Sequence, residues 1–420
     1  MSALDYLGEG FSYRQDVLYC EEVELARVAA AAGTPTFVYS SHGILARYRA
    51  YDEAFGAAPH QVCYAVKANS NLSVLRLLAE AGSSFDIVSG GELFRVLKAG
   101  GKAARVVFSG VGKTAAEIEY ALNEGIGCFN CESETELALI DACASRLGKR
   151  ARCAIRVNPD IDPKTHPYIS TGLKDNKFGI DINEVEDVYR RALNLRSVDM
   201  AGVSCHIGSQ MLDSTPIAEA VDRMIALTES LRALGAPIEH LDFGGGIGIP
   251  YRDADRMPSI AATIEGLCAR AAKLGLELHV EPGRSITGSA GVLLTRVLNR
   301  KTTQAKEFVV IDAAMNDLLR PTLYKAHHEI VPLRRIPAMG YVEADVVGPV
   351  CESGDYIAQN RRLANVMPGD TLAVCSAGAY GFVMSSNYNS RPRAAEVLVE
   401  GASFRTVRER ETLEDLVRGE

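Results

Sequence analysis

The sequence predicts an α/β plus all-β chain, with a (β/α)8 barrel of the TIM type followed by a C-terminal β domain. Three observations indicate this. The 420 residues suffice for two domains. Eight short apolar runs between Val62 and Glu281 alternate with helical patterns. After about Ile286, strand-like runs continue with short, turn-rich gaps and little helix.

The barrel strands are predicted from apolar runs, and a helical pattern fills most gaps, as with Leu72, Leu75 and Leu78 on one helix face. The runs are VCYAV (62–66), FDIV (85–88), RVVFS (105–109), IGCFN (126–130), CAIRVN (153–158), AGVSCHI (201–207), EHLDF (239–243) and ELHVE (277–281). Alternating strands and helices imply a parallel sheet, and eight strands in this length suit a closed barrel.

A doubly wound open sheet is the alternative. Its dinucleotide fingerprint is missing, because GGGIGIP at 244–250 carries Ile249 where the third glycine of G-x-G-x-x-G should stand. The barrel is therefore favoured.

The second domain is predicted from the runs VLLTRVL, EFVVIDA, EADVVGPV, DTLAVCSAGAY and AAEVLVEG. We expect residues 36–285 to form the barrel domain and residues 286–420 the β domain. Residues 1–35 precede the barrel pattern and are expected to pack with the β domain, because chain ends often lie together.

Composition excludes several classes of partner. The net charge is −8 and no Lys/Arg block occurs, which argues against nucleic-acid and membrane partners. No signal peptide or membrane span is recognisable, and ten scattered cysteines suggest a reducing compartment, so we expect a cytoplasmic protein. The C-x-x-C of Cys128 and Cys131 lacks partners at zinc spacing, and no metal site is predicted.

Chemistry-bearing residues follow the predicted strands at the face where barrel enzymes place their active sites. Lys67 ends the first strand, Asp86 lies on the second, and His206 ends the sixth. Glycines 244–246 follow the seventh strand and EPGR, 281–284, follows the eighth. The loops after strands seven and eight commonly bind phosphate, and glycine lets backbone N–H groups approach its oxygens. Tight turns that merely need glycine are the alternative.

Pyridoxal 5′-phosphate (PLP) needs a binding site with four features: a phosphate cup, a lysine in an apolar wall, an acid and an imidazole. The lysine amine forms a Schiff base, and apolar surroundings lower its pKa and so favour the nucleophilic amine. Glu281 could keep the ring nitrogen protonated, and His206 could stack on the ring. An ion pair of Lys67 with Asp86, and a core role for His206, are the structural alternatives.

Seven motifs in order resemble the fold-type III PLP-dependent decarboxylases over nearly the whole chain. They are YAVKAN, HIGSQ, GGGIGIPY, EPGRSITGSAG, MNDLLRPTLY, GPVCESGD and GAYGFVMSSNYNSRPR. Departures are conservative, such as Ile247 where a larger apolar residue is common. The resemblance implies an alanine racemase-like architecture and a head-to-tail homodimer with shared active sites.

The resemblance also implies residue roles. PLP would be held by Lys67, Asp86, His206, Ser209, Gly245, Gly246, Glu281, Gly283, Arg284 and Tyr380. Substrate would be bound by Arg284, Arg320, Tyr324, Glu352 and Tyr380. Catalytic roles would fall to Lys67, His206, Glu281 and Cys351, with Cys351 the proton donor from the partner subunit. A buried structural cysteine is the alternative for Cys351, and a surface position for each arginine.

The implied activity is decarboxylation of meso-2,6-diaminopimelate to L-lysine and CO2, the last step of lysine biosynthesis. Loss of CO2 leaves a carbanion that needs a proton, which a thiol can give. The far end of this substrate keeps a carboxylate and an ammonium. Arginine forks such as Arg284 and Arg320 match the carboxylate, and Glu352 matches the ammonium.

Three other functions remain open. A related decarboxylase of ornithine, arginine or carboxynorspermidine would not explain two arginines together with Glu352. A non-catalytic PLP-binding or regulatory homologue would be expected to lack Lys67 or Cys351, or to need only the barrel. An alanine-racemase-like enzyme would carry arginine, in place of Glu281, at the ring nitrogen.

Overall fold

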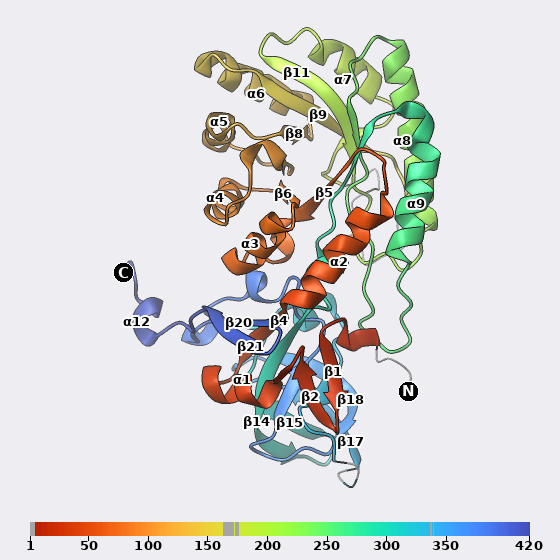
Figure 1. Ribbon diagram of the computed structural model, residues 1–420. Helices are drawn as coiled ribbons and strands as arrows, with labels where there is room; N and C mark the ends of the chain where they lie inside the picture. The colour runs from red at the N-terminus through yellow and green to blue at the C-terminus, as the bar shows by residue number, and fades with distance from the viewer. Residues whose placement is uncertain (1–4, 163–171, 173–175, 337, 339) are drawn as a thin grey trace. The chain divides into compact units, whose positions relative to one another are not determined.

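The computed structural model describes residues 5–162, 172, 176–336, 338 and 340–420, and the chain forms two compact units (Figure 1). The barrel unit comprises Tyr48–Gly248 and Met257–Ser285. The β unit comprises Met1–Arg47, Ile249–Arg256 and Ile286–Glu420. Within the described residues, none of the helices has the length and apolar character that a membrane crossing requires.

Eight parallel strands close the barrel, as the sequence predicts, and the open doubly wound sheet is wrong. They are β5 (His60–Ala65), β6 (Ser84–Ile87), β7 (Val106–Phe108), β8 (Cys128–Cys131), β9 (Ala151–Asn158), β11 (Val198–Cys205), β12 (His240–Asp242) and β13 (Glu277–Val280). Each pairs with the next, and β13 pairs with β5 to close the ring. A short strand, β10 (Ile180–Asp181), pairs with β9 outside the ring.

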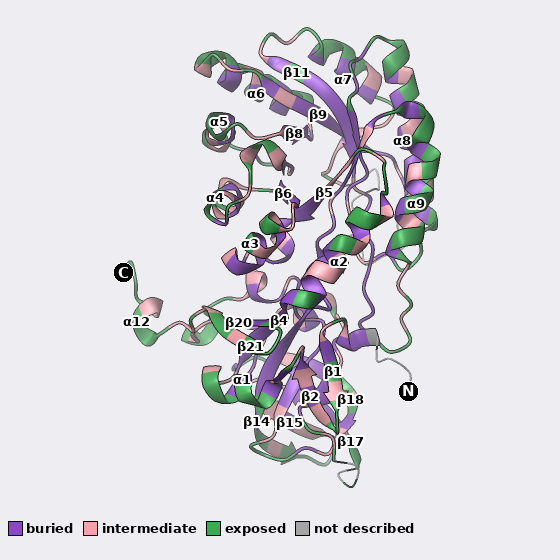
Figure 2. Cartoon of the chain, in the orientation of Figure 1, coloured by how far each residue is buried: buried purple, intermediate pink, exposed green. Residues whose placement is uncertain are grey.

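One helix precedes the first barrel strand, and the others follow the barrel strands in sequence. They are α2 (Ser41–Ala54, which begins in the β unit), α3 (Leu72–Glu80), α4 (Gly90–Lys98), α5 (Ala115–Glu124), α6 (Glu134–Leu147), α7 (Val185–Ala192), α8 (Thr215–Ala233) and α9 (Ile260–Ala271), with 3-10 turns at Val66–Ala68, Ala103–Arg105 and Ala272–Leu274. Side-chain caps start several of them, because Asn71, Ser89 and Thr114 accept hydrogen bonds from first-turn N–H groups. Figure 2 shows buried strands and helices whose outer faces are exposed.

The β unit is built on a long sheet with the path β18-β17-β15-β14-β4-β20-β21, and β19 and β16 branch from β14. Its strands are β4 (Thr36–Ser40), β14 (Gly291–Thr302), β15 (Glu307–Ile311), β16 (Ile330–Pro332), β17 (Tyr341–Val347), β18 (Tyr356–Ala364), β19 (Thr371–Val374), β20 (Ala395–Glu400) and β21 (Ser403–Arg408). A smaller antiparallel sheet joins β1 (Phe11–Arg14), β2 (Val17–Cys20) and β3 (Val23–Glu24).

Helices are short in the β unit. They are α1 (Leu25–Ala32), α11 (Arg320–Tyr324) and α12 (Leu413–Leu416), with 3-10 turns at Asp5–Leu7, Phe382–Met384 and Tyr388–Ser390, while α10 (Arg284–Thr287) starts in the barrel unit. One apolar core packs side chains from the N-terminal segment, such as Phe11 and Leu18, against the long sheet. The strand β4 lies within residues 36–285, which the sequence predicts to form the barrel domain. It pairs instead with β14 and β20 of the β unit.

Candidate active site

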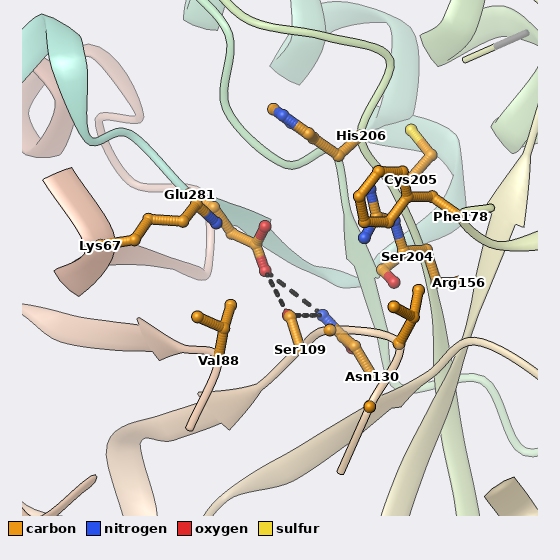
Figure 3. A pocket seen from close by; sticks show the side chains of 13 residues that line it. Lys67, Val88, Ser109, Asn130, Arg156, Phe178, Ser204, Cys205, His206 and Glu281 are labelled. Carbon is orange, nitrogen blue, oxygen red and sulfur yellow. Dashed lines mark hydrogen bonds between the residues drawn. The ribbon is translucent and has the colours of Figure 1, made fainter. Parts of the chain in front are cut away.

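Lys67 follows a buried strand and enters a cavity of about 420 Å³ in the barrel unit (Figure 3). The strand β5 ends at Ala65, and one 3-10 turn then carries Lys67. The Tyr64 hydroxyl donates to the Asn69 carbonyl oxygen at 3.0 Å and so braces this turn. The lysine side chain is 38% exposed, which leaves its amine accessible from the cavity.

Asp86, on the neighbouring strand β6, holds the lysine amine. Its Oδ2 accepts from Lys67 Nζ at 2.8 Å, and the carboxylate is fully buried. The other oxygen, Oδ1, accepts no hydrogen bond from the described residues. The ion pair that the sequence offers as an alternative is therefore present, and it also positions the amine at the cavity wall.

His206 lines the same cavity as a neutral imidazole. Its Nδ1 accepts a hydrogen bond from the Gly245 N–H at 3.2 Å, so the ring proton resides on Nε2. Burial lowers its pKa well below the usual value, and the positive charges of Arg156 and Lys67 lower it further. An uncharged flat ring at a cavity wall suits stacking on an aromatic cofactor.

Glu281 follows β13 and faces the cavity beside two polar groups, as Figure 3 shows. Its Oε1 accepts from Ser109 Oγ at 3.4 Å and from Asn130 Nδ2 at 3.3 Å. Burial raises its pKa well above the usual value, Asp242 and Asp86 raise it further, and Lys67 opposes them. This carboxyl therefore retains a proton readily.

The glycine-rich loop after β12 is tightly packed. A Cβ on Gly245 would lie 2.2 Å from the Glu281 carbonyl oxygen, and Gly246 has φ +119°. Gly283 approaches the side chains of Ala65 and Ala68, where a Cβ would lie within 3.1 Å of both. These loops accept no side chain without a shift, which is the requirement of a backbone cradle.

Arg284 begins α10 and is buried. Its Nε and Nη2 donate to Ser209 Oγ at 3.3 and 3.1 Å. A guanidinium and a hydroxyl thus lie together where the sequence predicts phosphate contacts.

The charges of the barrel interior fit PLP. Three carboxyl groups, those of buried Asp86 and Asp242 and of half-buried Glu281, interact with one another and with Lys67. A protonated ring nitrogen facing Glu281 would add a second positive charge to this group. Together with the glycine cradle and the neutral His206, these residues fit the cofactor.

Sequence reasoning missed further residues of this site, namely Ser109, Asn130, Arg156, Phe178 and Asp242. Ser109 directly follows β7 and Asn130 lies near the end of β8, and both line the cavity. The rule that finds Lys67 at a strand end would have found these two. Phe178 lies against the Arg156 guanidinium, whose Cζ is 4.8 Å from the ring centroid, and nothing in the strand pattern indicates that contact.

The remaining predicted residues lie in the β unit. Buried Arg320 lies over the Tyr324 ring, with Cζ 5.8 Å from its centroid. Glu352 accepts a 2.7 Å hydrogen bond from the hydroxyl of Tyr388. Cys351 is exposed, so it is no buried structural cysteine. Tyr380 has φ +55°.

The barrel and its cavity define a class of enzyme. Residues 41–288 match a family described as "Pyridoxal-dependent decarboxylase, pyridoxal binding domain", and the chain belongs to this family. Its cofactor is therefore pyridoxal phosphate.

Relatives place the chain more narrowly, among the diaminopimelate decarboxylases. That of Pseudomonas aeruginosa is 53% identical, with 98% of each chain covered. The crystal structure of the Helicobacter pylori enzyme complexed with L-lysine superposes with a TM-score of 0.91 at 44% identity, covering 94% of this chain and 98% of that chain. The M. jannaschii enzyme in co-complex with L-lysine gives a TM-score of 0.93 at 36% identity, with 98% and 97% covered.

Proposed function

We propose that this chain is a PLP-dependent carboxy-lyase that converts meso-2,6-diaminopimelate to L-lysine and CO2, the last step of lysine biosynthesis. The observation that carries the proposal is the single cavity lined by Lys67, His206 and Glu281. The relatives named for this reaction, two of them solved with L-lysine, support the choice of substrate and product.

Each residue of the cavity has a defined task. Bound PLP supplies an electron sink for the charge that departing CO2 leaves behind. Lys67 holds the cofactor covalently, and Asp86 orients its amine through the 2.8 Å contact. Glu281, which lines the cavity, would keep a proton at the ring nitrogen, and His206, on the same cavity wall, would cover the ring. The phosphate is held by Ser209, Gly245, Gly246, Gly283 and Arg284, together with Tyr380 from the β unit.

The β unit supplies recognition of the far end of the substrate and the final proton. Buried guanidinium groups, such as Arg320, bind a carboxylate through paired hydrogen bonds, and Glu352 binds the ammonium. Arg284, Tyr324 and Tyr380 complete this set. The Cys351 thiol then delivers a proton to the carbon that lost CO2.

The substrate assignment predicts strong selectivity in an assay of purified holoenzyme. With meso-diaminopimelate, CO2 and lysine should appear in equal amounts. With ornithine or arginine, kcat/KM should fall by about 10²-fold or more, because a buried guanidinium is left without its carboxylate. Equal turnover of ornithine would contradict the substrate, while cofactor absorbance without any turnover would favour a non-catalytic homologue.

We also propose a head-to-tail homodimer in which Cys351 reaches the Lys67 cavity of the partner subunit. Among the ten cysteines, all of them free, Cys351 is the exposed one. A proton donor that enters another subunit's site has to be accessible on its own chain. Free cysteines throughout also suit the reducing cytoplasm, where we place the protein.

Complementation between two inactive variants tests the shared site. Neither Lys67→Ala nor Cys351→Ala should be substantially active alone. After subunit exchange, about a quarter of native activity should return, because about half of the dimers are mixed and each holds one intact site of two.

Mass spectrometry of tagged chains confirms that exchange is complete. If Lys67 and Cys351 act within one chain, a mixed dimer contains no intact site and activity stays at the single-variant level. That result would exclude the shared site and leave the decarboxylase assignment intact.

A further inference from the structure

Arg156 is a buried cation of the cavity that has no task in the mechanism proposed above. It lies on β9, is 8% exposed and lines the Lys67 cavity, and Figure 3 shows it beside Phe178. Its Nη1 donates to Glu132 Oε1 at 2.7 Å. Its Nε and Nη2 have no hydrogen-bond acceptor within the described part of the chain. Buried donors without an acceptor are costly, so we expect a ligand in the cavity to supply one.

Glu132, which directly follows β8, fixes the position of this guanidinium. The glutamate side chain is 3% exposed and does not itself line the cavity. Its Oε1 also accepts from the Gly110 N–H at 3.1 Å, and its Oε2 accepts from the Gly179 N–H at 2.8 Å. A carboxylate held at both oxygens is a rigid partner, and the Phe178 ring covers the guanidinium from another side. The remaining donors of Arg156 are therefore preorganised for an acceptor.

The order of the strands indicates which part of PLP such an acceptor would be. In the ring of eight strands, β9 lies four strands from β5 in either direction, and the proposed phosphate cradle follows β11, β12 and β13. In PLP, the ring nitrogen is opposite the carbon that bonds the lysine, and the phosphate arm and the ring oxygen are on opposite flanks. With the phosphate at that cradle, the ring oxygen faces the strands from β6 to β9. Arg156 is the cation that lines the cavity from this arc, as far as the described residues show.

The two carboxylates of the substrate fit Arg156 less well. The far carboxylate already has Arg284 and Arg320 in the proposed function. The reacting carboxylate leaves as neutral CO2, so a guanidinium bound to it would stabilise the charged ground state more than the transition state and slow the reaction. The ring oxygen takes part in no bond breaking, so its binding carries no such penalty.

We propose that Arg156 binds the ionised ring oxygen of PLP through Nε or Nη2, with Glu132 as its positioning residue. This assignment rests on the proposed function, in which Lys67 and Glu281 hold the cofactor. It adds a cofactor-binding residue to the predicted set, on the flank of the ring that lies away from the phosphate.

The test compares two ligands of the apoenzyme by equilibrium dialysis: PLP and 3-deoxypyridoxal 5′-phosphate, which lacks only the ring oxygen. A charge-assisted hydrogen bond to that oxygen exists with PLP alone. We therefore expect Arg156→Met to weaken PLP binding by about tenfold or more and binding of the deoxy analogue by less than about twofold. Arg152→Met is the matched control on the same strand, because Arg152 pairs with Glu239 and does not line the Lys67 cavity. It should leave both dissociation constants unchanged.

Equal weakening of PLP and of the deoxy analogue by Arg156→Met would overturn the proposal, because general damage to the cavity does not distinguish the two ligands. Unchanged dissociation constants with a raised KM for meso-diaminopimelate would also overturn it, and would assign Arg156 to a substrate carboxylate. If Arg156→Met does not fold, as judged by circular dichroism, the double variant Glu132→Gln/Arg156→Met is compared with Glu132→Gln. The double variant leaves no unpaired buried carboxylate.

Borohydride labelling of the wild-type protein separates this proposal from the proposed function. Absence of a cofactor label on Lys67 would refute the proposed function itself. A normal label on Lys67, beside a wild-type ratio of the two dissociation constants in Arg156→Met, would refute only the role of Arg156.

Discussion

Replacing Lys67 by alanine should leave a folded protein that no longer holds PLP covalently and no longer decarboxylates its substrate. The amine is accessible from the cavity and oriented by Asp86, and no second lysine lines that cavity among the described residues. We expect activity to fall on the order of 10³-fold or more, which corresponds to about 4 kcal/mol of lost transition-state stabilisation.

Borohydride reduction of the wild-type protein followed by peptide mapping checks the attachment directly, and the label should lie on Lys67. Lys149→Ala is the matched control, because this barrel-unit lysine donates only to backbone oxygens of Leu122 and Asn123. Its variant should retain cofactor and activity. A label on any other lysine would end the assignment.

Changing Glu281 to glutamine should slow decarboxylation far more than it weakens cofactor binding. Glutamine fills the same space and can still accept from Ser109 and Asn130, but it has no ionisable carboxyl to keep the ring nitrogen protonated. Each lost pKa unit of basicity at the ring nitrogen corresponds to about 1.4 kcal/mol, and a loss of orders of magnitude in kcat follows. Glu281→Arg should be at least as slow.

Steady-state kinetics measures the slower decarboxylation, and equilibrium dialysis of the cofactor measures any weaker cofactor binding. Glu277→Gln on the same strand is the control. Glu277 accepts from Gln61 and forms a hydrogen bond with His279, and its side chain does not line the Lys67 cavity. Near-native turnover of Glu281→Gln, with Glu277→Gln also unaffected, would contradict the role at the ring nitrogen.

The periodicity of the sequence was enough to predict all eight barrel strands, because buried parallel strands are short apolar runs that any single sequence displays. Their order along the chain gave the fold class, and the strand-end rule put Lys67, His206 and Glu281 at one face. The structure places all three in one cavity. Their roles stay predictions.

Local patterns could not show which strands pair across long sequence separations. The residues Thr36–Ser40 precede the first barrel strand, yet they pair with Gly291–Thr302 and Ala395–Glu400 in the β unit. The sequence of a five-residue apolar run does not identify the strands with which it pairs, because pairing is decided by the register and burial of segments distant in sequence.

By itself, then, the sequence determined the barrel, the second β unit and the lysine at a strand end, since each follows from local periodicity or a local motif. Only the tertiary structure decided the surroundings of Glu281. Ser109, Asn130 and Asp242 come from three different strands and meet it through contacts that span 172, 151 and 39 positions, the last being the difference between 281 and 242. The strong rise in the Glu281 pKa exists because closing the barrel buries these groups together, where little water remains to separate their charges.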